Sequence, residues 1–332
     1  MKVLVVAPYP PRRDGIASYA AVQVQRLREA GHAVTVLSPP DGDGDVKAEF
    51  LGGDGFRRAA ALAATHDRVL VHFQPSLYYR PRAALSKIST SRALLALCRR
   101  PNVEVLVHEA DPPKLWRPDY VLLAAAFRRA SRLWFHTLTE QEALERGYRV
   151  RTRGALVRHQ DGIRVNPVGR DEGRRRLGLD PEEALLVCPG FVHPDKGFDR
   201  AVAAFGRIGD GALVVVGSVR DAIPANLTYA SRLREACAAT PGASWREGFA
   251  SDADLDAWIA AADAVALPYR RSWSSGMLAR AQALGTPAIV ARVGGLPEQA
   301  GERDVVFQTD DELEIAMRDA VARANDRLRE AR

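Results

Sequence analysis

The sequence has little cysteine, and its three cysteines form no recognisable motif. Cys98, Cys188 and Cys237 stand far apart in a chain of 332 residues, each in an apolar or helical context. Disulfide frameworks and zinc sites need closer and more regular spacing, so the pattern favours buried free thiols in a reducing compartment. The cytoplasm is therefore the expected location.

Long hydrophobic runs and metal-binding motifs are also missing. No apolar stretch approaches the roughly 20 residues that a helix needs to cross a bilayer. The opening MKVLVVAPYPP is interrupted by proline too early for a signal peptide. No Asp-x-Asp motif stands directly at the end of an expected strand. We therefore expect no membrane span, no metal and no cofactor.

Basic residues are unevenly distributed along the chain. The net charge is +6, with 26 Lys and Arg against 16 Asp and Glu in residues 1–165, and 21 against 25 in residues 166–332. A basic first half favours attraction to anionic lipid headgroups at the inner face of the membrane, or to a phosphorylated acceptor. A solvated arginine-rich surface is the alternative. No basic run alternates with aromatic residues, so nucleic acid is not an expected partner.

Apolar runs of strand length alternate with helical patterns throughout the chain. The runs are continuous stretches of Val, Leu, Ile and Ala, which is typical of parallel strands covered on both faces. Such alternation predicts an α/β fold, and the length suffices for two parallel sheets. We expect a boundary near residues 160–172, where Gly, Pro and Asn replace the periodic pattern. The expected domains are 1–165, with strands at 2–7, 33–38, 68–73, 103–108, 132–137 and 154–159, and 166–332, with strands at 185–190, 212–218, 264–269 and 287–292.

Ligands of doubly wound sheets bind outside the carboxyl ends of the strands, so the residues after each strand are the candidates for a site. The first segment of interest is PYPPRRDGIASYAAVQVQRLREAGHAV at residues 8–34, with Gly15 at the start of a helix. A glycine there lets backbone amides approach a phosphate at the positive end of the helix dipole. An ordinary strand–helix turn also contains such a glycine, so both interpretations stay open.

The second segment is CPGFVHPDKGFDRAVAAF at residues 188–205. It places Lys196 between a strand end and an amphipathic helix, where its ammonium group can reach into a cleft and neutralise a departing diphosphate. A surface lysine beside a turn glycine is the alternative.

The third segment is LPYRRSWSSGMLARAQALGTPAIVARVGGLPEQ at residues 267–299. Small polar residues lead into a helix, whose first amides, at residues 275–278, are expected to be unpaired and to point at an anion. The next strand also ends in glycines. Together with Lys196 this predicts a diphosphate cradle, and the residues expected to bind it are Ser274, Ser275, Gly276, Met277, Gly295 and Glu298.

In order and spacing, these segments resemble the retaining GT-B glycosyltransferases of glycosyltransferase family 4. The family's Gly-Arg-Leu-x-x-x-Lys-Gly segment corresponds to GFVHPDKG at 190–197, and its Ala-x-Gly-x-Pro-Val-Ile and Gly-Gly-x-x-Glu segments to ALGTPAI at 283–289 and GGLPE at 294–298. The resemblance implies two Rossmann-like, doubly wound domains that face a central cleft. The first would be the acceptor side and the second would bind the nucleotide-sugar donor, with the last helix packing back on the first domain.

The chain departs from this family at three positions of the donor site. Phe191 replaces the arginine that holds the diphosphate together with the lysine. The two glutamates of the Glu-x7-Glu motif fall on Ser272 and Arg280, so the sugar and the ribose must be contacted differently. We expect Arg280 either to reach an anionic group of the donor or to lie on the helix surface.

The resemblance also implies roles for residues of the first domain. A family histidine at the end of the strand VEVLVH lies near the transferred sugar, so His108 joins Lys196 as an expected catalytic residue. A capping or core histidine is the alternative. The loop after the preceding strand is aromatic and basic, which suits an acceptor with apolar and anionic parts. The residues expected on the acceptor side are His72, Tyr78, Arg80 and Glu109.

The predicted activity is transfer of a sugar from a nucleotide-diphosphate-sugar to a hydroxyl of a carbohydrate, lipid-linked or small-molecule acceptor, with retention of anomeric configuration. The resemblance implies that the leaving phosphate takes the acceptor proton, without a metal. The absent glutamates leave two alternatives: a catalytically inactive nucleotide-sugar-binding homologue, and another GT-B enzyme such as an epimerase or a pseudo-glycosyltransferase.

Overall fold

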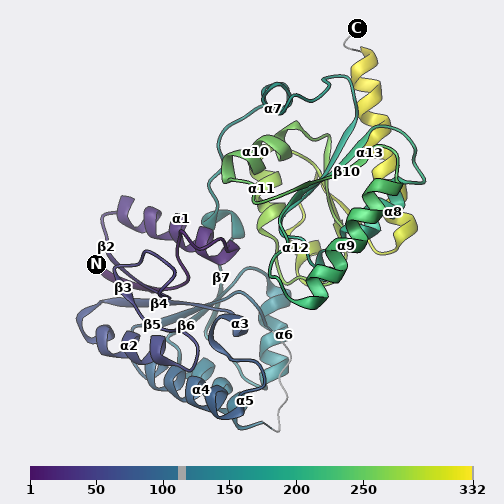
Figure 1. Cartoon of the computed structure of the whole chain (residues 1–332). Coiled ribbons are helices and arrows are strands. Elements are labelled where there is room, and N and C mark those ends of the chain that lie inside the picture. Colours follow the sequence, from purple (N-terminus) through teal and green to yellow (C-terminus); the bar gives the residue numbers. More distant parts are fainter. Residues whose placement is uncertain (111–116, 331–332) are drawn as a thin grey trace. The chain divides into compact units, whose positions relative to one another are not determined.

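Two parallel β-sheets, each in its own unit of the chain, form the framework of the protein. The computed structural model describes residues 1–110 and 117–330. Unit 1 comprises Met1–Ile163 and unit 2 comprises Arg164–Arg332. Each sheet is parallel throughout and is flanked by helices (Figure 1). The predicted α/β fold with two parallel sheets is confirmed.

The sheet of unit 1 has seven strands in the order β3-β2-β1-β4-β5-β6-β7. The strand order reverses between β1 and β4, which is where doubly wound sheets open a crevice for ligands. On one face, β1 packs against Ala20 and Val24 of α1, and helices α2, α4 and α5 cover the other face (Figure 1). The elements are β1 (Lys2–Val6), α1 (Gly15–Glu29), β2 (Ala33–Ser38), β3 (Val46–Lys47), α2 (Asp54–Leu62), η1 (Ala63–Thr65), β4 (Arg68–Phe73), α3 (Pro75–Tyr78), α4 (Ala84–Cys98), β5 (Val103–Val107), α5 (Pro118–Arg129), β6 (Arg132–Phe135), α6 (Leu138–Tyr148), β7 (Gly154–Leu156) and η2 (His159–Gly162).

The sheet of unit 2 has six strands in the order β10-β9-β8-β11-β12-β13, so the same reversal falls between β8 and β11. The elements are α7 (Arg170–Leu177), β8 (Leu185–Pro189), η3 (Pro194–Lys196), α8 (Phe198–Phe205), β9 (Ala212–Gly217), α9 (Pro224–Ala239), β10 (Ala243–Glu247), α10 (Asp252–Ala261), β11 (Ala264–Leu267), α11 (Gly276–Leu284), β12 (Ala288–Ala291), α12 (Leu296–Gln299), β13 (Val305–Phe307) and α13 (Asp310–Glu330).

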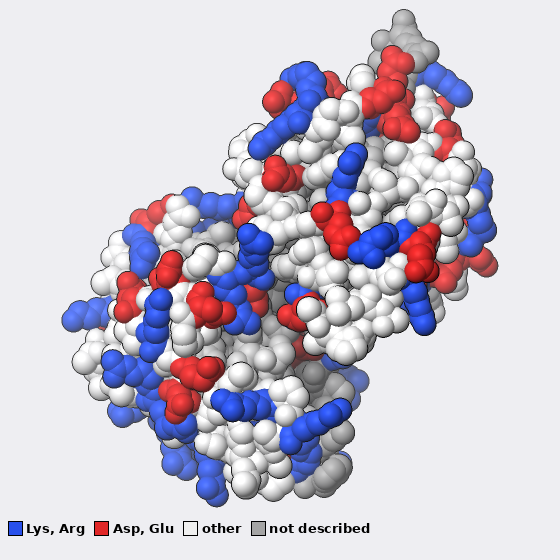
Figure 2. Space-filling view, viewed as in Figure 1, with Lys and Arg blue, Asp and Glu red and all other residues white. Residues whose placement is uncertain are grey.

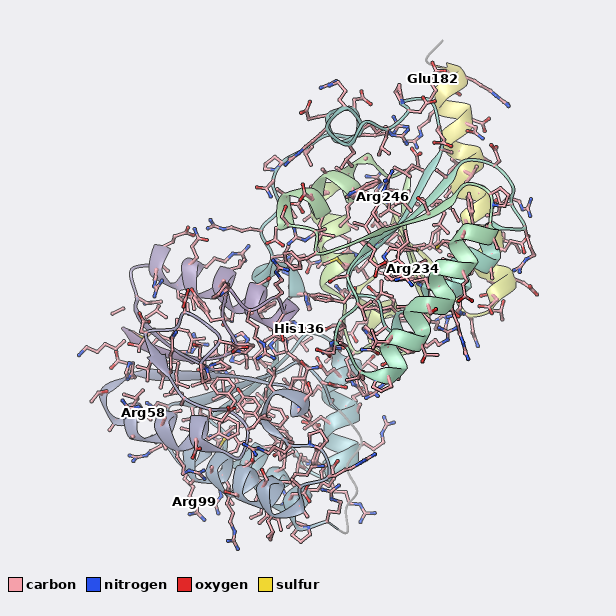
Figure 3. The ribbon with its side chains drawn as sticks, viewed as in Figure 1. Arg58, Arg99, His136, Glu182, Arg234 and Arg246 are labelled. Atoms are coloured by element: carbon pink, nitrogen blue, oxygen red, sulfur yellow. The ribbon has the colours of Figure 1, made fainter. Side chains whose placement is uncertain are left out.

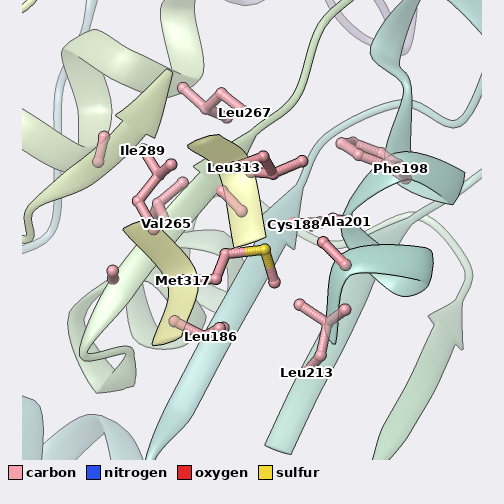
Figure 4. Close-up of a cluster of buried hydrophobic side chains, with 14 of the residues drawn as sticks. Leu186, Cys188, Phe198, Ala201, Leu213, Val265, Leu267, Ile289, Leu313 and Met317 are labelled. Carbon is pink, nitrogen blue, oxygen red and sulfur yellow. The ribbon is translucent and has the colours of Figure 1, made fainter. Parts of the chain in front are cut away.

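Strand periodicity divides the core of unit 2 into two layers. Leu186 of β8 belongs to the cluster that includes Phe198 and Met317, from α8 and α13 (Figure 4). The neighbouring Val187 belongs to the cluster on the opposite face, with Trp258 of α10. Burying side chains of this size contributes about 1.5–3 kcal/mol each, so both faces of the sheet need their helices.

The last helix belongs to the second unit, to which the sequence assigned it. Helix α13 packs against α8 and against β8, β11, β12 and β13, all in unit 2. Its apolar side chains, among them Leu313, Met317 and Val321, are part of the unit 2 core.

The three cysteines are buried free thiols, as predicted. Burial raises the pKa of Cys98 and of Cys188, so both stay protonated and unreactive at neutral pH. Among the helices of the described residues, none has the length and apolarity required to cross a membrane.

The segment that joins the two units is anchored on both sides. The Arg26 guanidinium of α1 donates a hydrogen bond to the carbonyl oxygen of Ile163 at 3.1 Å. In unit 2, the backbone and side-chain nitrogens of Asn166 both donate to Asp256 Oδ2, at 2.7 and 2.8 Å. Only two residues separate these anchors.

Candidate functional site

Three loops of unit 2 meet at the carboxyl edge of its sheet, and glycines make this possible. A Cβ at Gly197, after β8, would lie 2.2 Å from the carbonyl oxygen of Pro268, after β11. A Cβ at Gly294, after β12, would lie 1.8 Å from the carbonyl oxygen of Ser272. Both glycines have positive φ, +62° and +51°, a conformation that other residues rarely adopt. The loops after β8, β11 and β12 therefore pack at the point where the strand order reverses.

Lys196 is held at this edge by an aromatic ring. Its Nζ lies 3.7 Å from the centroid of the Tyr269 ring, and the Tyr269 hydroxyl lies 3.4 Å from Ser275 Oγ. Ser275 is the N-cap of α11. Within the described residues no carboxylate pairs with Lys196. The chain thus places an ammonium group near the start of a helix without neutralising it.

The first turn of α11 has fewer open amides than we expected. Ser275 Oγ accepts from the amide of Leu278 at 3.2 Å, and the amide of Ser275 donates to Gln299 Oε1 at 2.9 Å. The amides of Gly276 and Met277 have no hydrogen-bond partner in the part of the chain that the structure describes. Two of the four expected amides, rather than all of them, are available to an anion.

The remaining small residues of the third segment bind one another. Ser272 Oγ donates to the carbonyl oxygen of Ser274 at 2.8 Å, and the amide of Gly295 donates to the carbonyl oxygen of Trp273 at 3.1 Å. Ser272, Ser274 and Gly295 thus shape the loop after β11. Glu298 lies exposed in the first turn of α12.

The loop after β8 approaches α11 closely. Gly190 has a φ of +116°, and a Cβ there would contact Met277 Cγ at 3.4 Å. Phe191 follows and is half-buried. The nearby His193 has its pKa lowered to about 3, first by burial and then by the positive charges of Lys196 and Arg220. The neutral histidine reports a positive potential at this edge, which favours an anionic ligand.

Arg280 corrects one of our two expectations for it. The residue is only 5% exposed, so it does not lie on the helix surface. It hydrogen-bonds Asp256 and lies 3.2 Å from Asp252 Oδ1, so it joins α11 to α10. The residue at the second position of the motif is a buried structural cation.

In unit 1, the start of α1 is less suited to a phosphate than the sequence indicated. Asp14 is the N-cap, and its Oδ1 accepts from the amides of Ile16 at 2.7 Å and Ala17 at 3.4 Å. A carboxylate already occupies the positive end of the helix and would repel an anion. Gly15 has open space where a Cβ would be.

Four histidines follow one another along the carboxyl edge of the unit 1 sheet. His72 lies in β4, His108 and His136 directly follow β5 and β6, and His159 begins η2 after β7. We call these four residues the histidine row. The ring of Tyr19, on α1, packs edge-on against all four imidazoles, with centroid distances of 5.4 to 5.8 Å.

Hydrogen bonds connect part of the histidine row to α1. His72 Nδ1 lies 3.0 Å from His108 Nε2, and His72 Nε2 lies 2.8 Å from Gln23 Oε1. His136, labelled in Figure 3, has its Nδ1 3.2 Å from the carbonyl oxygen of Val157. Burial is the largest cause that lowers the pKa of His72 to about 3, of His136 to about 4, and of His108 well below its ordinary value. These three imidazoles are neutral at pH 7.

Some polar atoms of this cluster are buried without a hydrogen-bond partner in the described structure, among them the Tyr19 hydroxyl and His136 Nε2. Gly162 packs on the Tyr19 ring so closely that a Cβ there would lie 1.9 Å from it. Tyr19, Gln23, His136 and His159 were not identified from the sequence, although each of the last four predicted strands of the first domain contains a histidine near its end.

Two of the expected acceptor residues are core residues. Tyr78 is fully buried, stacks on Phe56 at 4.4 Å, and donates its hydroxyl to the carbonyl oxygen of His72 at 2.8 Å. His72 is fully buried too. Neither side chain can line an open acceptor site. Arg80 is exposed, and Glu109 Oε2 accepts from Gln74 at 3.0 Å.

Across the residues that the structure describes, no three or more His, Cys, Asp or Glu side chains are arranged to hold a metal ion. The histidine row is included in this statement. Its imidazoles contact one another and Tyr19 instead.

Comparisons with known proteins agree with this geometry. Residues 183–324, within unit 2, match the family model described as Glycosyl transferases group 1. The chain is 28% identical, over 358 residues, to the GDP-mannose-dependent alpha-(1-6)-phosphatidylinositol monomannoside mannosyltransferase of Mycobacterium tuberculosis, covering 96% of this chain and 88% of that protein.

Solved structures show the same fold. Sucrose-phosphate synthase from Thermosynechococcus elongatus superposes with a TM-score of 0.74 at 16% identity, covering 99% of this chain and 93% of the other. Anabaena HepE in complex with UDP-glucose has a TM-score of 0.68 at 15% identity, covering 100% and 99%. The two units thus have the GT-B fold that we expected, and the chain is a transferase homologous to glycosyltransferases.

Proposed function

We propose that this enzyme transfers a sugar from a nucleoside-diphosphate sugar to a hydroxyl group of an acceptor, with retention of anomeric configuration. The observation that carries the proposal is the position of Lys196 beside the start of α11, where two amides are open and three loops converge, two of them through glycines. This arrangement lies inside the segment that matches the glycosyl transferase model. Unit 2 would bind the donor and unit 1 the acceptor.

The residues of unit 2 suit the leaving group of such a reaction. As the anomeric C–O bond breaks, negative charge grows on the diphosphate, and preorganised positive groups lower the barrier. Lys196 and the amides of Gly276 and Met277 would supply them. Glu298 is exposed near the same edge and would contact the donor's ribose or sugar.

The proton and the sugar would be handled without a metal. The leaving phosphate would take the proton from the acceptor hydroxyl, and His108 would position the transferred sugar. Phe191, Ser272 and Arg280 cannot supply the charge contacts that the family's arginine and two glutamates give. The donor sugar would then be recognised by hydroxyls and backbone groups of the loop after β11.

Substitution of Lys196 by alanine tests this mechanism. We expect turnover to fall about 100-fold or more, the size of one lost transition-state electrostatic contact, while the melting temperature stays unchanged. Lys47→Ala is the control, because Lys47 is exposed and its Nζ lies 3.6 Å from Asp43 at the edge strand β3, away from Lys196 in the sequence and in the other unit. Equal turnover for the two variants would remove Lys196 from the mechanism.

The buried Arg280 favours a second candidate, a homologue that binds a nucleotide sugar without turnover. A thermal-shift series with uridine, guanosine, thymidine and adenosine diphosphates and their sugars identifies the nucleotide, since ligands that bind only the native state stabilise it. Nucleoside diphosphate released only with an acceptor would establish transfer. Binding without release would establish the second candidate, and a product without a new glycosidic bond would indicate an epimerase or pseudo-glycosyltransferase.

We also propose that unit 1 contacts anionic lipid at the inner face of the membrane. Lys and Arg predominate over α2 and α4 in Figure 2. A groove there is lined by Arg57, Arg92 and apolar residues of α4, among them Leu85, which is 84% exposed. Basic charge around exposed apolar surface fits anionic headgroups.

Vesicle sedimentation tests this contact. Leu85→Asp should release the protein from phosphatidylserine vesicles, and neutral phosphatidylcholine vesicles should bind neither form. Ile315→Asp, at a site 58% exposed on α13, is the matched control. Equal retention of both variants would contradict the proposal.

A further inference from the structure

The hydrogen-bond partners of the histidine row fix where its protons lie. Gln23 Oε1 is an acceptor, so His72 must carry its proton on Nε2 to bond it at 2.8 Å. His72 Nδ1 then holds a lone pair. The 3.0 Å contact to His108 Nε2 is a hydrogen bond only if His108 donates from that nitrogen.

For this orientation of the Gln23 amide, neutrality of both rings completes the assignment. Burial keeps the pKa of both imidazoles far below 7, so each ring carries one proton. With the proton of His108 on Nε2, its Nδ1 must hold a lone pair. The side-chain oxygen of Gln23 thus determines, through His72, which nitrogen of His108 donates a hydrogen bond and which accepts one.

The two rings differ in exposure. His72 is fully buried between Gln23 and His108, whereas His108 is half-buried at the carboxyl edge of the sheet. Hydrogen bonds hold the backbone of both histidines in place. The amide of His108 donates to the carbonyl oxygen of Phe73 at 2.8 Å, and the carbonyl oxygen of His72 accepts from the Tyr78 hydroxyl. His108 is the member that a ligand can reach.

We propose that Gln23 and His72 are positioning residues that lock His108 as its Nε2–H tautomer, so that His108 Nδ1 accepts a hydrogen bond from a hydroxyl group of the carbohydrate substrate. The carbohydrate identity of the ligand rests on the proposed function; the tautomer does not. A lone pair selects a hydroxyl or amide donor and rejects the diphosphate of a nucleotide sugar, whose oxygens carry no proton at neutral pH. The histidine row thus recognises the neutral part of a substrate whose charged part binds elsewhere.

Nitrogen-15 NMR of labelled imidazoles tests the tautomer in the protein without substrate. The expected spectrum shows His108 protonated at Nε2 and unprotonated at Nδ1. Gln23→Leu removes the acceptor and should leave a mixture of tautomers, whereas Gln23→Glu keeps an acceptor oxygen and should preserve the single form. A His108 proton on Nδ1 in the unmodified protein would overturn the proposal whether or not transfer is observed.

Kinetics test the consequence. We expect Gln23→Leu to lower kcat/KM about 10-fold, the size of one hydrogen bond, and Gln23→Glu to stay within about 3-fold of the unmodified enzyme. Gln25→Leu is the matched control, since Gln25 is exposed on the same helix. Equal losses for the Leu and Glu variants of Gln23 would show a merely structural role.

A second pair of variants examines His72. His72→Asn can place an amide oxygen near the position of Nδ1 and should retain most of the activity and the His108 tautomer. His72→Leu removes the acceptor and should lose both. Retention of the tautomer in His72→Leu would contradict the relay even if the proposed glycosyl transfer were itself disproved.

Discussion

The two sheets share one strand order, yet different kinds of residue form their carboxyl edges. Unit 1 fills its edge with four imidazoles around a tyrosine, and the three with lowered pKa are buried or half-buried and neutral. Unit 2 ends its strands with glycines of positive φ, among them Gly190, Gly217 and Gly294. On the function that we propose, the edge of unit 1 would bind its ligand through side chains and the edge of unit 2 through backbone groups.

This difference follows from the ligand chemistry that each edge suits. A phosphate is best held by amides and a helix start, which a Cβ would block. Hydroxyl groups are best held by neutral acceptors and donors at defined atoms. On this proposal the same order of strands would serve two kinds of binding, because the residues that follow the strands differ between the two sheets.

The largest effect is expected when a side chain is placed on the glycine edge. Gly217→Ala would put a Cβ 2.0 Å from the carbonyl oxygen of Gly190 at a φ of +149°, so the backbone must move. We expect the free energy of unfolding to fall by about 4 kcal/mol or more, measured by urea denaturation. Gly209→Ala is the control: its φ is +71° but nothing lies within 4 Å, and it should cost only about 1–2 kcal/mol.

Low pH should destabilise the edge of unit 1 more than the edge of unit 2. The unfolded chain protonates histidine below its ordinary pKa of about 6.5, whereas folded His72 and His136 resist protonation down to about 3 and 4. Their stabilisation is therefore complete above pH 6.5 and is lost as the pH falls toward these values. At pH 5 the loss is on the order of 2 kcal/mol for each.

Hydrogen-exchange mass spectrometry at pH 7 and pH 5 measures this effect by region. Unit 1 has three such histidines and unit 2 has His193, so peptides of β4 to β6 should lose more protection than those of β8 to β12. Equal losses in the two units would contradict the difference we infer between the edges.

Arg280 should matter for stability more than for the donor. Arg280→Met leaves Asp256 buried with one partner fewer, and we expect a loss of about 3 kcal/mol in unfolding free energy. Arg280→Met combined with Asp256→Asn removes both charges while keeping the acceptor for Asn166, and should recover most of it. A large change in nucleotide affinity without a stability change would place Arg280 at the donor after all.

The smallest effect concerns two buried tyrosines of unit 1. Tyr19→Phe removes a hydroxyl without a described partner and should change the unfolding free energy by less than about 0.5 kcal/mol or raise it. Tyr78→Phe removes a hydroxyl bonded to the carbonyl oxygen of His72 at 2.8 Å and should cost about 1 kcal/mol. Calorimetry that finds equal costs would show that Tyr19 has a partner in solution.

The fold could be predicted because buried parallel strands appear as continuous apolar runs. The strands β3, β10 and β13 escaped notice because each lies at a sheet edge or is very short; β10, with sequence ASWRE, is half exposed and has no apolar run. Local sequence also places Lys196 near the start of α11, because both follow strands on either side of the reversal in strand order.

The details of the site depended on residues distant in sequence. The side chain that occupies the Ser275 amide comes from Gln299, and the partner of Arg280 is Asp256 on another helix. No local pattern around residues 272–280 contains either contact. Four predicted strands each contain a histidine near the end, so the histidine row could have been noticed in the sequence. Its packing around Tyr19 could not, because the sheet brings these residues together.

The anchored joint between the units has a mechanical consequence. With Ile163 held by Arg26 and Asn166 held by Asp256, any hinge rotation is concentrated in the four soft backbone dihedrals of Arg164 and Val165. A proline at position 165 would fix the φ angle of that residue, so this one substitution is expected to slow rotation at the joint without altering the carboxyl edge of either sheet.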